Sequence, residues 1–322
     1  MFIETPWLRR FELWKAKGID FTDQRGMNTM LNFVRKYLGR FPRIQRMTTS
    51  LMWKKHMLSD WSNTYLFKSK IVAKTPFGFK LVSRKYIANR LMLQGTFETD
   101  EMEVIKTHIQ NADVFVDVGA NIGLYTCMAK SFGKHVVAIE PQPQNLECLY
   151  ANLINNNWTD VEVFPIGLSH KPGILTLYGA SGPSASLISG WAGYSHHFKK
   201  IISVNTMDAL LDKRFADKKM FIKIDVEGAE YDVLSGALKT ICRYPRPSWF
   251  IEICLSEFHP GGGNPNFLST FELFLKNGYE VRLANTKNIS VSLEDIKKWA
   301  LDKHTTTNEF NYLFTPKENS SR

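Results

Sequence analysis

The stretch DVGANIG, residues 117–123, directly follows the apolar run VFV of residues 114–116. A buried strand that ends in a glycine turn and continues into a helix is how doubly wound α/β folds hold a nucleoside-containing cofactor. Glu140 follows the next apolar run, residues 136–139, and an acidic side chain there can accept hydrogen bonds from ribose hydroxyls. The turn and its spacing to Glu140 therefore predict a cofactor site.

Asn121 narrows the choice of cofactor. It stands where the dinucleotide pattern G-x-G-x-x-G has its second glycine, the residue that lets the backbone approach a pyrophosphate. A cofactor that has a ribose but no phosphate fits this turn better. S-adenosylmethionine (SAM) is such a molecule, and the sequence therefore predicts a SAM site.

Length and composition are those of a globular protein. The chain has 322 residues, of which 44% are hydrophobic, enough for one large α/β domain with an accessory segment. No apolar run reaches the roughly 18 residues of a membrane span, and the first residues lack the apolar core of a signal peptide, so we expect a cytoplasmic location. The cysteines form no C-x-x-C pair, and we expect four buried free thiols: Cys127, Cys148, Cys242 and Cys254.

The positive charge lies in the first part of the chain. Residues 1–90 hold 19 lysines and arginines but only 5 acidic residues, whereas the whole chain has a net charge of +10. Residues 1–62, with an apolar stripe at helical spacing, are predicted to form a basic helical accessory segment. This charge favours an anionic partner for residues 1–90, either a membrane surface, an acidic acceptor or a nucleic acid; the alternative is a solvated helical face. If the segment binds lipid, the protein is peripheral to the membrane.

The remaining pattern predicts two further parts. Residues 63–112 are expected to form a hairpin and a helix that lead into a SAM-binding domain, residues 113–322. Strands are expected near residues 113–118, 135–140, 161–166, 220–225, 248–254 and 279–284, with residues 311–314 as a last, antiparallel edge strand. Seven strands of this kind are the Rossmann-like, doubly wound α/β sheet of class I SAM methyltransferases. Residues 167–205 interrupt the pattern with a short hairpin at 173–178 and a long loop at 179–194.

A second group of chemically active side chains occupies KIDVEGAE, residues 223–230. An apolar strand ends there in Asp225 and Glu227, after which Gly228 opens a helix. Ligands bind at the carboxyl ends of strands in open α/β sheets. The three carboxylates can act as a general base, as ligands of a divalent cation, or as charges that complement a helix N-terminus.

Longer motifs closely resemble the FkbM family of SAM-dependent methyltransferases. The resemblance is carried by residues 117–126, 139–153 and 223–237, and by the shorter elements 95–98, 184–187 and 206–210. It covers about residues 95–283 and does not extend to the basic segment.

The resemblance implies methyl transfer to a hydroxyl of a sugar, glycan, glycolipid or related metabolite. By position it places the following residues against SAM: Asp117, Gly119, Ala120, Asn121, Gly123, Tyr125, Thr126, Glu140, Pro141, Asn145, Ile166, Gly167 and Asp225. Members of the family often have an acidic residue near Ser169 and His170, and this chain has none there.

The chemistry of a hydroxyl acceptor requires help with proton removal, because an alcohol is a poor nucleophile. Asp225 and Glu227 are predicted to act as the base or as ligands of a divalent cation such as magnesium. Glu252 and His259, near the end of the next strand, are secondary catalytic candidates.

Two other functions are compatible with the pattern. One is an RNA methyltransferase that uses the basic segment to follow phosphates, although the chain has no recognisable RNA-binding motif. The other is a SAM-binding protein without catalytic activity, which the intact Asp117, Glu140, Asp225 and Glu227 count against.

Overall fold

The computed structural model describes residues 70–84, 87–95, 97, 99–179, 185–193, 198–307 and 309–317. The basic accessory segment expected at residues 1–62 lies outside these residues and stays a prediction. Thr96, Glu98 and Ser184, which belong to the shorter motifs, also lie outside them.

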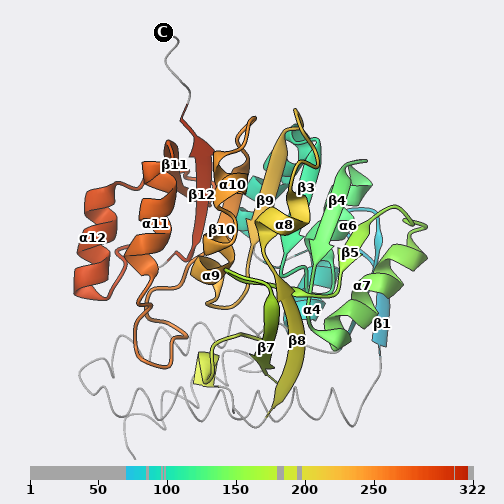
Figure 1. The fold of residues 1–322 in the computed structure, drawn as a ribbon. Coiled ribbons are helices and arrows are strands. Elements are labelled where there is room, and N and C mark those ends of the chain that lie inside the picture. The colour runs from blue at the N-terminus through green and yellow to red at the C-terminus, as the bar shows by residue number, and fades with distance from the viewer. Residues whose placement is uncertain are drawn as a thin grey trace, which may run out of the picture. The chain divides into compact units, whose positions relative to one another are not determined.

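The main sheet has seven strands in the order β11-β12-β10-β9-β3-β4-β5 (Figure 1). The strands are β3 (Val114–Val118), β4 (His135–Ile139), β5 (Glu162–Phe164), β9 (Met220–Ile224), β10 (Ser248–Glu252), β11 (Tyr279–Leu283) and β12 (Asn311–Pro316). Only β12 is antiparallel to its neighbours. The Rossmann-like, doubly wound sheet is therefore confirmed. The edge position predicted for the last strand is wrong, because β12 pairs with β10 on one side and β11 on the other.

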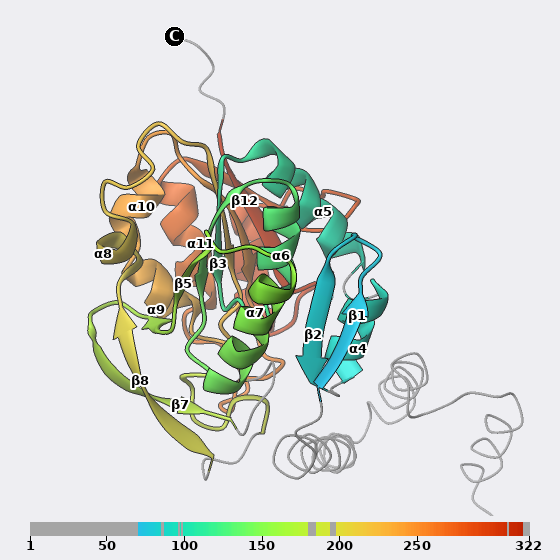
Figure 2. The ribbon, with the colours of Figure 1, turned by 90° about the vertical axis from the view of Figure 1, so that its right-hand side faces the viewer.

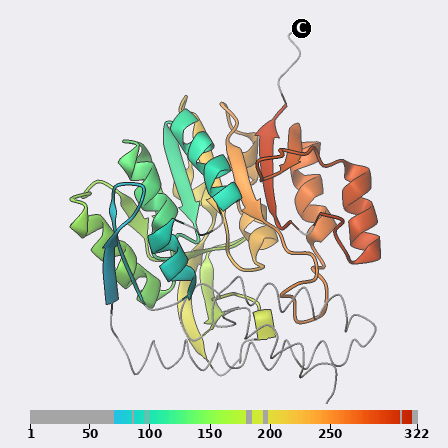
Figure 3. The same ribbon diagram turned by 180° about the vertical axis from the view of Figure 1, so that it is seen from behind.

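Helices cover both faces of this sheet (Figure 2). One face carries α8 (Met207–Leu211), α9 (Glu230–Ser235), α10 (Leu238–Cys242), α11 (Phe267–Lys276) and α12 (Leu293–Asp302). The other, seen from behind in Figure 3, carries α4 (Ile87–Gln94), α5 (Thr99–Asn111), α6 (Leu124–Ser131) and α7 (Pro143–Asn155). Successive strand residues point to opposite faces, so Val116 and Phe115 belong to different cores.

The segment before the main sheet forms a hairpin followed by helices. The antiparallel strands β1 (Lys70–Lys74) and β2 (Lys80–Arg84) precede α4 and α5. Phe79 and Leu81 bury the hairpin against the core that α5 and α6 share. The Asn152 side chain of α7 accepts a hydrogen bond from the Val82 amide and donates one to the Val82 carbonyl, which fixes the hairpin beside α7.

The interruption at residues 167–205 forms a separate three-stranded sheet, β6 (Gly167–Leu168), β7 (Gly173–Tyr178) and β8 (Lys199–Asn205), in the order β6-β8-β7. The hairpin predicted at residues 173–178 is wrong, because this segment is a single strand whose partner, β8, lies 20 residues further along the chain. Ile202 and Val204 of β8 pack on Leu177 and drive the pairing. The predicted loop contains the short turn η1 (Trp191–Gly193).

Two smaller expectations are settled by the described residues. Cys127, Cys148 and Cys254 are buried free thiols as predicted, but Cys242 is exposed because it ends the short helix α10. None of the described helices has the length and apolar character needed to cross a bilayer.

Candidate cofactor and catalytic site

The turn between β3 and α6 has the shape that the sequence predicts. Gly119 has φ +80°, and a Cβ atom there would lie 1.9 Å from the carbonyl oxygen of Asp225. Gly123 has φ +87°, and its Cβ would lie 2.3 Å from Leu149 Cδ1. Both positions therefore require glycine. The amides of Gly119 and Ala120 donate to the Ile139 carbonyl, at 2.9 and 3.0 Å, which joins the turn to the end of β4.

Asp117 supplies a buried carboxylate at the end of β3. The Thr126 hydroxyl donates to its Oδ2 at 2.6 Å, whereas Oδ1 is buried and has no hydrogen-bond partner among the described residues. Burial raises the pKa of Asp117, and the nearby Lys223 ammonium opposes this shift. An unpaired buried acceptor is costly, so Oδ1 suits a donor from a ligand.

Glu140 closes the turn from the other side. Its Oε2 accepts from the Asn121 amide at 2.8 Å, and its Oε1 accepts from the Gln142 amide at 2.8 Å and from Asn145 Nδ2 at 3.3 Å. Burial raises the pKa of Glu140 to about 7. Asn121 itself has φ 53°, a left-handed conformation that asparagine tolerates. Three of the predicted cofactor residues thus meet in one hydrogen-bonded group, with Pro141 between Glu140 and Gln142.

Lys223 is a site residue that the sequence reasoning missed. It lies opposite Asp117 in the β3–β9 register and is 3% exposed. Its Nζ is 2.8 Å from Asp225 Oδ2 and 5.2 Å from the centre of the Tyr125 ring. A buried ammonium needs a partner of opposite charge, and here Lys223 compensates the charge of Asp225. This pair lies beside the turn of residues 119–123, which is called the cofactor turn below.

Glu227 is held by a residue from a distant loop. Trp191 Nε1 donates to Glu227 Oε2 at 2.6 Å, and the Ser186 hydroxyl donates to the Glu227 carbonyl at 2.6 Å. Burial and the charge of Asp225 raise the pKa of Glu227 well above its usual range, and the hydrogen bond from Trp191 opposes this shift. A carboxyl with a raised pKa is a stronger base when it is ionised.

The two secondary catalytic candidates lie at the end of β10 and in the loop that follows it. His259 is 9% exposed; its ring lies 4.8 Å from that of Trp191, and its Nε2 is buried without a hydrogen-bond partner among the described residues. Burial lowers the pKa of His259. Glu252 is the last residue of β10 and accepts from Cys254 Sγ at 3.6 Å. Trp191 contacts both His259 and Glu227, and therefore links these two catalytic candidates.

Two of the residues expected to contact SAM, Ile166 and Gly167, lie where the small sheet begins. Ile166 is half-buried and packs on the hydrophobic core that contains Val116. Gly167 lies in β6, where a Cβ atom would be 3.0 Å from Ile202 Cδ1. His170 Nδ1 is 3.7 Å from Asp232 Oδ1, so α9 brings an acidic side chain to the place where the local sequence has none. Proximity in the sequence could not reveal this residue.

The expectation of a divalent cation gains no support. Within the part of the chain that the structure describes, no group of three or more histidine, cysteine, aspartate or glutamate side chains could hold a metal ion. Asp225 instead pairs with Lys223.

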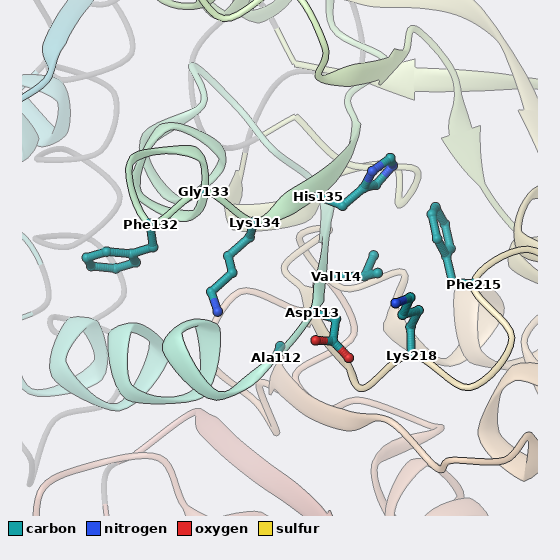
Figure 4. A pocket seen from close by; sticks show the side chains of 9 residues that line it. All are labelled: Ala112, Asp113, Val114, Phe132, Gly133, Lys134, His135, Phe215 and Lys218. Atoms are coloured by element: carbon teal, nitrogen blue, oxygen red, sulfur yellow. The ribbon is translucent and has the colours of Figure 1, made fainter.

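A cavity of about 420 Å³ opens at the opposite edge of the sheet, where β3 and β4 begin (Figure 4). Two of the polar side chains around it have protein partners: Lys134 Nζ donates to the Gln110 carbonyl at 2.7 Å, and Asp113 Oδ2 accepts from the Lys219 amide at 2.9 Å. It lies at the amino ends of these strands, whereas Asp117 and Glu140 lie at their carboxyl ends.

Residues 223–230, called the acidic segment below, include Glu230, and the pKa of this residue can be tested. Its Oε1 accepts from the Gly228 amide at 2.9 Å, and burial raises its pKa to about 7. The fold thus favours the neutral acid, so its contribution to stability is complete below the ordinary pKa of 4.5 and is lost as the pH rises through about 7. We expect Glu230→Gln to raise the melting temperature by several degrees at pH 8 and little at pH 5, measured by calorimetry.

The matched control is Glu103→Gln, which changes an exposed glutamate of α5 that pairs with Lys106. Its melting temperature should follow that of the unchanged protein at both pH values. An equal effect of Glu230→Gln at pH 5 and pH 8 would contradict the raised pKa.

Comparison with known proteins agrees with this geometry. A sequence profile of the methyltransferase FkbM domain matches residues 117–281, which include the cofactor turn and the acidic segment. The hexuronic acid methyltransferase AglP of Haloferax volcanii is 30% identical over 141 residues, 43% of this chain and 56% of AglP. The chain thus spans little more than half the length of this curated relative.

Solved structures include similar folds at low sequence identity. The O-methyltransferase from Bacillus cereus in complex with SAH is 12% identical, with a TM-score of 0.37 over 66% of this chain and 78% of that protein. A SAM-dependent methyltransferase from Agrobacterium tumefaciens is 10% identical, with a TM-score of 0.38 over 76% of this chain and 69% of that protein. The family profile covers half of the chain, and the protein therefore belongs to the FkbM family of SAM-dependent methyltransferases.

Proposed function

We propose that the protein transfers a methyl group from SAM to a hydroxyl of a sugar, glycan, glycolipid or related metabolite. The observation that carries this proposal is the contact between the cofactor turn and the acidic segment. Gly119 faces the Asp225 backbone so closely that a Cβ would lie 1.9 Å from its carbonyl oxygen. Two carboxyl side chains, Asp225 and Glu227, therefore border the site where the cofactor would bind.

The residues of the turn fit SAM. Asp117 Oδ1, which has no partner among the described residues, would accept a hydrogen bond from the ammonium group of the methionine part. Glu140 accepts two hydrogen bonds at Oε1 and one at Oε2 within the protein, which leaves Oε2 able to accept another from a ribose hydroxyl. When bound, SAM supplies an electrophilic methyl group on a sulfonium centre.

Glu227 is our choice for the base. The acceptor oxygen must lose its proton as it gains the methyl group, and a carboxyl with a raised pKa accepts a proton well. Trp191 engages Oε2, so we assign the proton to Oε1. Lys223 compensates the charge of Asp225, which would otherwise repel the developing alkoxide. Holding the hydroxyl in line with the methyl group supplies a further part of the acceleration.

A sugar acceptor is favoured by the relative from Haloferax volcanii, which is named a hexuronic acid methyltransferase. A uronic acid carries a carboxylate, and the excess of basic residues in the first 90 residues would attract it. We therefore propose an acidic sugar as the first acceptor to test, in preference to RNA.

The test is a methyl-transfer assay with SAM labelled in the methyl group. The acceptors are a glycan that contains a uronic acid, the same glycan with the carboxyl reduced, and RNA. We expect labelled methyl ethers on the glycans, with more on the acidic one. Label in RNA alone would overturn the proposal in favour of the RNA methyltransferase, and bound SAM without transfer to any acceptor would favour the non-catalytic alternative.

A substitution tests the placement of the ribose. Glu140→Ala is expected to weaken binding of S-adenosylhomocysteine by about 1–3 kcal/mol, because charge-assisted hydrogen bonds to the ribose are lost. Calorimetric titration measures this change. Glu147→Ala is the matched control, since Glu147 lies on the same helix but pairs with Lys70 and Arg84 of the hairpin. Equal affinity of the two variants would remove Glu140 from the site.

A further inference from the structure

The segment 185–193 contacts the acidic segment through Trp191, which is 2% exposed although it lies in a short turn outside the main domain's helices and strands. Its indole N–H reaches Glu227 Oε2 at 2.6 Å. Ser186, in the same segment, donates to the Glu227 carbonyl and accepts from the Ile188 amide at 2.9 Å. Both the side chain and the backbone of Glu227 are therefore held by this segment.

The backbone of the acidic segment is shaped to receive the indole ring. Glu227 has φ 56° and Gly228 has φ +96°, so two successive residues adopt left-handed conformations. A Cβ at Gly228 would lie 2.3 Å from Trp191 Cζ3. Only glycine leaves room for the ring at position 228. Glu227 is a non-glycine residue in a left-handed conformation, and such residues are frequent at functional sites.

Trp191 and its neighbour Ala192 also contact the loop after β10. Its ring lies edge-to-face on His259, with centroids 4.8 Å apart and planes at 84°, and 5.8 Å from the Phe258 ring. The Ala192 amide donates to the Phe258 carbonyl at 2.8 Å. Trp191 is thus packed between the acidic segment and the loop that carries His259.

We propose that Trp191 is a positioning residue that holds the Glu227 carboxylate in the orientation needed to take the acceptor proton. This inference rests on the proposed function, in which Glu227 is the base. The hydrogen bond fixes Oε2, while the packing on Gly228 and His259 fixes the indole itself. A base held by a buried, fully packed partner keeps its geometry through the reaction. The charged groups that act on Glu227 are Asp225, Glu230 and Lys223.

The decisive variant is Trp191→Phe, which keeps an aromatic ring on Gly228 and removes the N–H donor. We expect kcat to fall roughly 10- to 100-fold, as for the loss of a hydrogen bond to a charged group, with unchanged affinity for S-adenosylhomocysteine. The acidic limb of the pH–rate profile should move to higher pH, because the lost bond stabilised the ionised carboxylate.

A second readout needs no acceptor. The eight tryptophans of the chain give indole N–H signals in a nitrogen-15 spectrum, and Trp191→Phe identifies one of them by its loss. We expect that signal to move with pH in the unchanged protein and not to titrate in Glu227→Gln. If Glu227→Gln leaves both the position and the titration of that signal unchanged, the proposed contact does not exist in solution.

Trp249→Phe is the matched control. Trp249 is fully buried and lies in the core. Trp249→Phe also removes a single hydrogen bond, which Trp249 Nε1 donates to the Tyr279 hydroxyl at 3.4 Å. If Trp191→Phe and Trp249→Phe lower kcat equally while Glu227→Gln abolishes turnover, the positioning role fails and the proposed function stands. If Glu227→Gln retains turnover, the proposed base is wrong and the inference fails with it.

Discussion

Replacing Glu227 with glutamine is expected to lower the rate of methyl transfer by a factor on the order of 10² to 10⁴, the usual contribution of a general base. Glutamine keeps the shape of the side chain and can still accept the hydrogen bond from Trp191 Nε1, but it cannot take a proton. Binding of S-adenosylhomocysteine should be unchanged, because in the proposed site the ribose would bind Glu140 and the methionine part would bind Asp117. Single-turnover kinetics with labelled SAM measures the chemical step directly.

Two further variants make this result interpretable. Glu272→Gln changes an exposed glutamate of α11 that pairs with Lys276, and it should keep full activity. Asp225→Asn should also lose turnover with nearly normal cofactor binding, since it leaves Lys223 buried beside a neutral amide. If Asp225→Asn is inactive and Glu227→Gln is active, the base is Asp225.

Replacing Gly119 with alanine is expected to abolish binding of S-adenosylhomocysteine and to lower the free energy of unfolding by about 3 kcal/mol or more. The new methyl group would lie 1.9 Å from the Asp225 carbonyl oxygen, which belongs to a backbone that cannot withdraw without separating β3 from β9. The left-handed φ of +80° adds its own strain. Calorimetry of binding and of thermal unfolding measures both effects.

Gly133 offers the matched control for this variant. It also has a left-handed conformation, φ +71°, but a Cβ there would meet no atom within 4 Å. Gly133→Ala should therefore cost only the conformational strain, about 1–2 kcal/mol, and bind the cofactor normally. If the two variants are equally stable and both bind S-adenosylhomocysteine, the close contact at Gly119 does not matter for the site.

The sequence predicts the main sheet well because its signals are local. Residues 114–116 and 136–139 are continuous apolar runs, and the stretch with the glycine turn, residues 117–123, follows the first of them directly. The strand β8 was missed for the opposite reason. It begins with two lysines, and Ile201 is 70% exposed beside the buried Ile202, so neither a continuous run nor a clear alternation marks it.

The candidate site is predictable only in part. The carboxyl ends of strands carry these four acids, within the last two residues of the strand or up to three residues after it: Asp117, Glu140, Asp225 and Glu227. Their position at one edge of the sheet follows from the parallel topology. Lys223 could have been found, since a charged side chain within an apolar strand must have a partner when it is buried. Trp191 could not, because its contact with Gly228 depends on how a 39-residue interruption folds back on the sheet.

The close approach of Gly119 to Asp225 has a consequence for synthesis of the protein. The ribosome synthesises the chain from its amino terminus, so the glycine turn and Glu140 leave the ribosome before β9 does. The Asp225 amide donates to the Val118 carbonyl at 3.0 Å, and the turn gains this neighbour only after Met220–Ile224 has paired with β3. We therefore expect a nascent chain that stops before β9 to bind SAM more weakly than the finished domain. The stability that bound cofactor adds would then reach the chain only after β9 has joined the sheet.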